Sequence, residues 1–211
     1  LSLKDFVDRI ARYPLAFQPG AAWRYSLSTD VLARVLEIAL NDTIENILSK
    51  YVLNPLEMLD TFYSVPKTKL YRLMPITGEP NLDKITEIKS SPTNLNEIDI
   101  NSFYSFNPEK NRPRGGHGLF STTADYHKFA NMLLTGQTPS GDRLISSKML
   151  RFSLKNRISK KQRPLFIDTV PQNGYGWNLL GRIMKNEGKS LILANKGEYG
   201  WAGAAATYFW I

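Results

Sequence analysis

Residues 17–26 read FQPGAAWRYS and place a tyrosine, Tyr25, shortly after a Pro-Gly turn and directly before a helix. Ser28 is expected to be the N-cap of that helix, which the pattern extends to Asn41. The apolar residues of the helix recur at helical spacing, as Val31, Leu32, Val35, Leu36, Ala39 and Leu40. Taken alone, a tyrosine in this setting is typical of a packing residue with a satisfied hydroxyl, so the rest of the chain decides its interpretation.

A second informative stretch, GGHGLFST at residues 115–122, predicts a glycine turn that leads into another helix. Thr122 with Asp125 three residues later resembles a capping box, with Asp where Glu or Gln is usual. Gly136 is expected to end this helix. The apolar residues again fall at helical spacing, as Tyr126, Phe129, Ala130, Leu133 and Leu134.

The remaining segments are less regular. Thr43 is expected to cap a helix that ends before Pro55. Residues 67–110 contain four prolines among Asn, Ser and Thr, which predicts a long irregular excursion with short elements. Two strand-like runs follow, at residues 174–180 and 207–211. Because the second run continues to the last residue, the sequence is expected to be a fragment of a longer protein.

The composition is that of a globular protein. Of the 211 residues, 42% are hydrophobic and 22% are charged, which excludes a disordered or collagen-like chain. No apolar run approaches the roughly 18 residues of a membrane span, so no transmembrane segment is predicted. The sequence has no cysteine, which excludes disulfides and thiolate zinc sites. The chain begins without a leader, so the compartment stays open between cytoplasm and periplasm.

The net charge of +8 is concentrated in residues 151–163, which carry six cations and no acid. A basic segment of this kind can indicate an anionic partner. It lacks the interleaved aromatic residues on which nucleic-acid bases stack, so no nucleic-acid partner is predicted and a solvated, mobile loop is expected.

Three phrases together resemble the serine β-lactamase and penicillin-binding protein family, in particular its class C-like esterase branch. The first is residues 17–26 followed by PLEMLDT at residues 55–61, and the second is residues 115–136. The third, residues 200–211, is similar to the family's final active-site strand. The phrases occur in the family's order.

The resemblance implies an α+β fold of the β-lactamase/transpeptidase type. Such a fold has an antiparallel sheet with flanking helices and a mainly helical lobe, with the active site between the two. We expect residues 1–170 to supply most of the helical lobe and the tyrosine loop, and residues 171–211 to begin the sheet. Because only part of that sheet is present, the helices are expected to expose apolar surface.

The resemblance also implies a covalent acyl-enzyme mechanism. The family's nucleophile is the serine of an S-x-x-K motif, and a tyrosine across the site acts with the lysine to remove the serine proton. Tyr25 is the position that matches this general base. Trp201, Ala202 and Gly203 match the third motif and are expected to bind substrate, and the backbone N–H of Ala204 is expected to help hold the oxyanion.

The sequence departs from the family pattern at three places. Its one serine with a lysine three residues later is Ser64, with Lys67, and a proline lies between them, so the nucleophile is expected to precede Leu1 and this chain alone to be inactive. Leu27 stands where lactam-processing members often carry an asparagine. Trp201 stands where they carry a lysine or histidine.

The second and third departures favour neutral, apolar substrates over amides that carry a carboxylate. Carboxylic ester hydrolysis is therefore the leading prediction. A β-lactamase or D-Ala-D-Ala peptidase-type amide hydrolase is the first alternative, and a non-catalytic relative that binds acyl-peptides or cell-wall fragments is the second. A third is an anion-binding protein, which the net charge of +8 would favour.

No cofactor and no metal site are predicted. The sequence has no Walker A or dinucleotide-binding glycine pattern. Its two histidines lack a clustered carboxylate: His117 is expected to bond local backbone in its turn, and His127 to lie on the surface. The natural substrate and the oligomeric state stay open.

Overall fold

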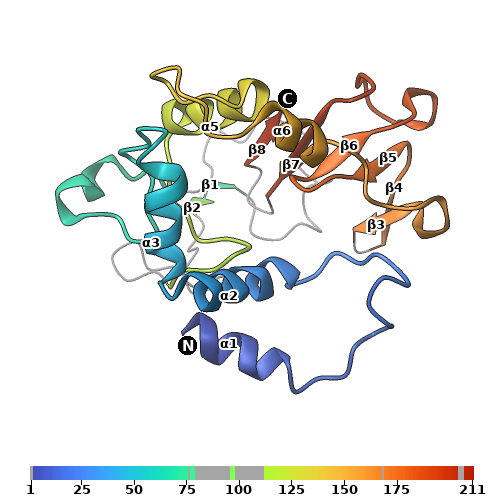
Figure 1. Cartoon of the computed structure of the whole chain (residues 1–211), viewed down its shortest axis with the longest axis horizontal. Coiled ribbons are helices and arrows are strands. Elements are labelled where there is room, and N and C mark those ends of the chain that lie inside the picture. The colour runs from blue at the N-terminus through green and yellow to red at the C-terminus, as the bar shows by residue number, and fades with distance from the viewer. Residues whose placement is uncertain (1, 76, 79–95, 98–111, 168, 204–206) are drawn as a thin grey trace.

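The computed structural model describes residues 2–75, 77–78, 96–97, 112–167, 169–203 and 207–211. Helices α1, α2 and α3 gather on one side, and a four-stranded antiparallel sheet lies on the other, next to α5 and α6 (Figure 1). The predicted α+β class is confirmed. Within the described ranges, no helix combines the length and the apolar character that crossing a membrane requires.

The helices are α1 (Leu3–Ile10), α2 (Ser28–Leu40), α3 (Ile44–Leu48), α5 (Thr123–Thr135) and α6 (Ser147–Ser153). A π-helical turn, Ser49–Leu53, continues α3, and short 3₁₀ turns occupy Lys67–Arg72, Lys160–Gln162 and Glu187–Lys189. The strands are β1 (Thr77–Gly78), β2 (Asn96–Glu97), β3 (Leu165–Ile167), β4 (Val170–Gln172), β5 (Tyr175–Trp177), β6 (Arg182–Met184), β7 (Tyr199–Ala202) and β8 (Tyr208–Trp210). β1 pairs with β2 and β3 with β4, and β5-β6-β7-β8 form the main sheet in chain order.

The helix caps predicted at Thr43, Thr122 and Gly136 are confirmed. Thr43 and Thr122 cap α3 and α5, because each hydroxyl accepts a hydrogen bond from the backbone N–H three residues later. Gly136 ends α5 in the left-handed conformation, with φ of 77°. The N-cap prediction for Ser28 is wrong: the helix begins at Ser28, and the N–H of Ser28 instead donates to the Ser26 hydroxyl at 3.3 Å.

The strand predicted at residues 207–211 is confirmed as β8, but the single active-site strand expected over residues 201–211 is wrong. These residues form the antiparallel pair β7 and β8, with Gly200 opposite Trp210 and Ala202 opposite Tyr208. β6 and the β3–β4 hairpin were not predicted, because strands of three residues are too short to show an alternating pattern.

The basic segment is more ordered than the solvated loop that the sequence predicts. Arg151 lies in α6, whose N-cap Ser146 accepts from Met149 N, and Lys160 lies in a 3₁₀ turn. Arg157 donates to the carbonyl of Phe152 at 2.7 Å. The cations themselves remain largely exposed.

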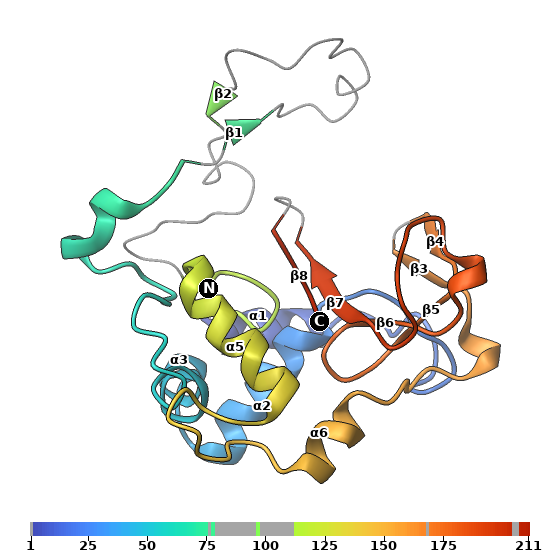
Figure 2. The same cartoon turned by 90° about the horizontal axis from the view of Figure 1, so that it is seen from above.

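The main core joins α5 to the sheet. Its buried members are Leu56, Met58, Met132, Leu133, Ile183 and Tyr199. Tyr199 of β7 donates its buried hydroxyl to the carbonyl of Leu133 in α5 at 3.1 Å, and burial raises the pKa of Tyr199 to about 12. The sheet and α5 are therefore one packed unit, seen from above in Figure 2.

A second, smaller core lies among the N-terminal helices. Leu3 of α1, Ala33 of α2 and Ile44 of α3 are buried together there. The apolar stripe of α2 nevertheless stays exposed, with Leu32 and Val35 both more than half accessible. The expected exposed apolar surface is therefore confirmed on α2.

Candidate active site

The loop that carries Tyr25 is shaped by its Pro-Gly turn. Ala21 N donates to Gln18 O at 3.0 Å, and Gly20 has φ of 84°, as the third position of a type II turn requires. The side chain of Gln162 donates to Gly20 O at 3.2 Å and ties this turn to the segment before β3. The turn thus directs the chain along the sheet towards the start of α2 (Figure 1).

Beyond the turn, two alternate residues of the loop contact the sheet. The ring centroids of Trp23 and Trp177 lie 4.8 Å apart, and those of Tyr25 and Trp201 lie 5.3 Å apart. Trp177 in turn contacts Trp201 edge-on at 4.8 Å. These four residues form one aromatic cluster, which attaches the loop to β5 and β7 by ring contacts.

Asn156 fixes the strand that carries Trp177. Its Oδ1 accepts from Trp177 N at 3.0 Å and from Ile158 N at 3.3 Å. A Cβ on Gly176 would collide with the Asn156 side chain, so only glycine permits this close approach. The sequence predicted no site role for Trp23, Trp177 or Asn156. The tryptophans of residues 17–26 and 174–180 were the available signal for Trp23 and Trp177.

The structure brings Tyr25 and Trp201 into contact and leaves the other predicted site residues near the ends of elements. Leu27 is the residue before α2, and its side chain is 48% exposed. Ala202 is the exposed last residue of β7. Gly203 follows it and donates its N–H to Thr207 O at 2.6 Å. Ala204, the predicted oxyanion donor, lies outside the described residues.

The glycine turn at residues 115–118 packs against the first turn of α2. Gly115 N donates to Oδ1 of Asp30 at 3.1 Å, and Asp30 is only 1% exposed. A Cβ on Gly115 would overlap the carbonyl of Thr29. The turn therefore positions the helix that begins directly after the tyrosine loop.

The phrases at residues 55–61 and 115–122 lie against each other. Phe62 and Phe120 exchange two backbone hydrogen bonds, at 2.9 and 2.8 Å. The carboxylate of Asp125 accepts from Asp60 N at 2.7 Å and from the Thr61 hydroxyl at 3.1 Å. Asp125 therefore accepts these two hydrogen bonds instead of completing a capping box with Thr122.

Ser64 and Lys67 do not form a nucleophile pair on one helix. Pro66 is the N-cap of the 3₁₀ turn that Lys67 begins, so Ser64 lies outside that turn. The match to S-x-x-K is a coincidence of spacing, as the intervening proline indicates. His127 is exposed on α5, and its predicted surface position is confirmed.

Comparisons with known proteins agree on one family. The family model described as Beta-lactamase matches residues 2–211. Protein Rv1367c of Mycobacterium tuberculosis (strain ATCC 25618 / H37Rv) is 28% identical over 204 residues, which are 95% of this chain and 48% of that protein. Lovastatin esterase of Penicillium rubens (strain ATCC 28089 / DSM 1075 / NRRL 1951 / Wisconsin 54-1255) is 31% identical over 130 residues, 61% of this chain and 30% of the esterase.

Among solved structures, "EstCE1, a hydrolase with promiscuous acyltransferase activity" superposes with a TM-score of 0.77 at 17% identity. The match covers 100% of this chain and 53% of EstCE1, and at 17% identity it supports a shared fold only. The chain thus spans about half the length, or less, of the relatives it matches.

Proposed function

The chain belongs to the beta-lactamase family and has its β-lactamase/transpeptidase-like fold, and on that premise we propose that it is part of a serine hydrolase that cleaves carboxylic esters through an acyl-enzyme. The observation that carries the proposal is the contact between Tyr25 and Trp201. It joins the residue that matches the family's general base to the residue that matches its substrate-binding strand.

The position of Tyr25 supports a role in removing the proton of the nucleophile. Its ring is held against Trp201 while its side chain is 50% exposed, so a substrate or a serine hydroxyl has access to it. A tyrosine with an ordinary pKa near ~10 needs an adjacent cation to act as a base at neutral pH. In this proposal the lysine of an S-x-x-K motif supplies that cation, and the serine of the same motif is the nucleophile.

The charge that develops on the substrate carbonyl also needs a donor. Gly203 N–H donates to Thr207 O, so it is already engaged and is not available to hold an oxyanion. We assign the role to the next N–H, that of Ala204, together with the N–H of the nucleophile. In this proposal the substrate contacts Trp201, Ala202 and Gly203, next to the N–H of Ala204.

The apolar character of the site supports ester substrates. Leu27 and Trp201 offer an exposed alkyl group and an indole where an amide partner and a cation would select a carboxylate-bearing amide. Two matched relatives are named for ester hydrolysis, lovastatin esterase and esterase EstB of Burkholderia gladioli. The proposed substrates are small neutral esters.

The decisive experiment follows the acyl-enzyme in the complete protein. A p-nitrophenyl butyrate reaction, quenched in acid during the initial burst, should yield protein whose mass is increased by one butyryl group on a serine. A Tyr25→Phe variant should accumulate that adduct more slowly. Turnover without any adduct would exclude the acyl-enzyme.

Two further assays on the complete protein distinguish the two alternatives. A chromogenic cephalosporin hydrolysed faster than the ester would favour the β-lactamase or peptidase alternative. Binding of acyl-peptides without cleavage of either substrate would favour the non-catalytic relative.

A further inference from the structure

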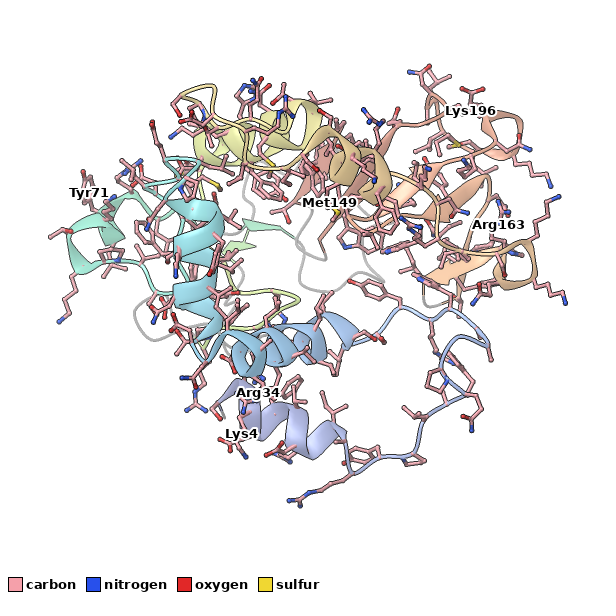
Figure 3. The ribbon with its side chains drawn as sticks, in the orientation of Figure 1. Lys4, Arg34, Tyr71, Met149, Arg163 and Lys196 are labelled. Carbon is pink, nitrogen blue, oxygen red and sulfur yellow. The ribbon has the colours of Figure 1, made fainter. Side chains whose placement is uncertain are left out.

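A hollow of about 400 Å³ lies beside the β3–β4 hairpin, at the start of β5. This volume lies within the range of small-molecule sites. Its wall contains three cations, Lys160, Arg163 and Lys189, together with the amides of Gln172, Asn173 and Asn186. No carboxylate contributes to this described wall. Figure 3 shows Arg163 at the end of the molecule that carries β3 and β4.

The three cations of the wall have no acidic partner among the described residues. Arg163 donates Nε–H to the carbonyl of Ser159 at 3.4 Å, which uses a neutral acceptor. Three positive charges around one small volume repel each other unless an anion is present.

A fourth cation lies behind this wall. The guanidinium of Arg182 stacks on the Tyr175 ring at 4.2 Å and donates to the side chain of Gln172, while its buried Nε has no described partner. Burial lowers the pKa of Arg182, and the nearby Tyr175 and Glu198 oppose this only in part. Both Tyr175 and Gln172 thus connect the hollow to a further positive charge.

We propose that this hollow is a binding site for the phosphate group of a small phosphate monoester. A phosphate monoester carries between one and two negative charges at neutral pH and three strong acceptor oxygens, which match several cations and side-chain amides better than a single carboxylate does. The hollow is larger than a phosphate, so it has room for the organic part of the molecule. Its cations and side-chain amides would hold both parts.

The proposed phosphate site is separate from the candidate active site and goes beyond the proposed hydrolase function. Tyr175 and Trp177 lie on the same face of β5, two residues and about 7 Å apart along the strand. Tyr175 borders the hollow, whereas Trp177 belongs to the aromatic cluster. The two sites therefore share one strand but no wall residue.

The test is calorimetric titration of the complete protein with glycerol 3-phosphate, with glycerol as the neutral control. The expected result is saturable binding of one glycerol 3-phosphate and no binding of glycerol. The double variant Lys160→Gln/Lys189→Gln should bind at least about tenfold more weakly, because two charge-assisted contacts are lost. The matched control Lys148→Gln/Lys155→Gln removes the same charge outside the wall and should retain the wild-type affinity.

Vesicle binding distinguishes a soluble ligand from a lipid headgroup. Binding to phosphatidic acid vesicles without binding to glycerol 3-phosphate would overturn the proposal in favour of a membrane contact. Equal losses of affinity in the wall variant and the control variant would also overturn it, because attraction by net charge would then account for the binding.

Discussion

The ring of Tyr25 lies 5.3 Å from the ring of Trp201, inclined to it by 40°. The contact places a loop that follows a Pro-Gly turn directly on strand β7, far along the chain. The proposed proton acceptor and the proposed substrate wall are therefore neighbours that position each other.

Tyr25→Phe tests the proposed general base. Only one hydroxyl is lost and the ring contact with Trp201 remains, so the fold and melting temperature should be preserved. In the complete protein the acylation rate should fall by roughly 10²–10⁴, the usual effect of removing an acid–base group. Single-turnover kinetics with a nitrophenyl ester measure that rate, and near wild-type acylation would show that Tyr25 only packs.

Trp177 should be the residue on which the aromatic cluster depends. Trp177→Ala removes its ring contacts with both Trp23 and Trp201, each worth about 0.5–1.5 kcal/mol beyond the buried area. We expect a loss of about 2–4 kcal/mol in the free energy of unfolding and a smaller loss for Trp177→Phe. Urea unfolding monitors both.

The control for that experiment is Tyr208→Ala, which removes an aromatic residue from the neighbouring β8. Tyr208 is 73% exposed, so its loss should cost less than about 1 kcal/mol. Equal losses for Trp177→Ala and Tyr208→Ala would mean that the cluster contributes no particular stability.

The parts of the fold that sequence predicts well are those that depend on local contacts. Thr43, Thr122 and Gly136 end their helices through bonds to residues three or four positions away, which are visible in the sequence. The Ser28 prediction failed for a local reason as well, since Ser26 accepts the N–H of Ser28 and the helix begins one residue earlier than predicted.

The site was predictable only in part, because its contacts join distant segments. The motif resemblance identified Tyr25 and Trp201, and the structure adds their contact. Neither periodicity nor spacing relates Trp23 to Trp177, or Asn156 to the Trp177 backbone. Such pairs are set by tertiary packing, on which a single sequence carries no direct signal.

Gly115→Ala tests the support of α2. The added Cβ would overlap the carbonyl of Thr29 and the side chain of Ala33, and the bond from Gly115 N to Asp30 would be displaced. We expect a loss of about 1–3 kcal/mol in the free energy of unfolding, the usual cost of overpacking. The matched control Gly188→Ala meets only an ordinary contact at 3.5 Å and should be nearly neutral by chemical denaturation.

Tyr199 should make the protein sensitive to alkaline pH. Burial raises its pKa to about 12, so between pH ~10 and 12 the unfolded chain loses a proton that the folded protein keeps. Its contribution to stability is complete below pH ~10 and falls as the pH rises towards 12, by about 2–3 kcal/mol in total.

Tyr199→Phe should remove this part of the alkaline loss. At pH 8 the variant should be less stable by about 1 kcal/mol, because the hydrogen bond to Leu133 O is lost. By pH ~11.5 the difference should have disappeared or reversed. Urea unfolding at both pH values measures it, and a difference that stays constant with pH would contradict the assignment to this hydroxyl.

Substitutions at two positions of the proposed site should shift its substrate preference. Trp201→Lys with Leu27→Asn restores the cation and the amide that lactam-processing relatives of this family carry at the matching positions. The new cation adds one charge-assisted hydrogen bond, worth about 1.5–3 kcal/mol, so the ratio of kcat/KM should shift towards a carboxylate-bearing amide by roughly ten- to a hundredfold. The measurement compares a nitrophenyl ester with a chromogenic cephalosporin on the complete wild-type protein and on the double variant. Trp201→Phe is the control, because it changes the wall without adding charge and should keep the ester preference. A wild-type protein that already prefers the cephalosporin would replace the ester proposal with the β-lactamase alternative.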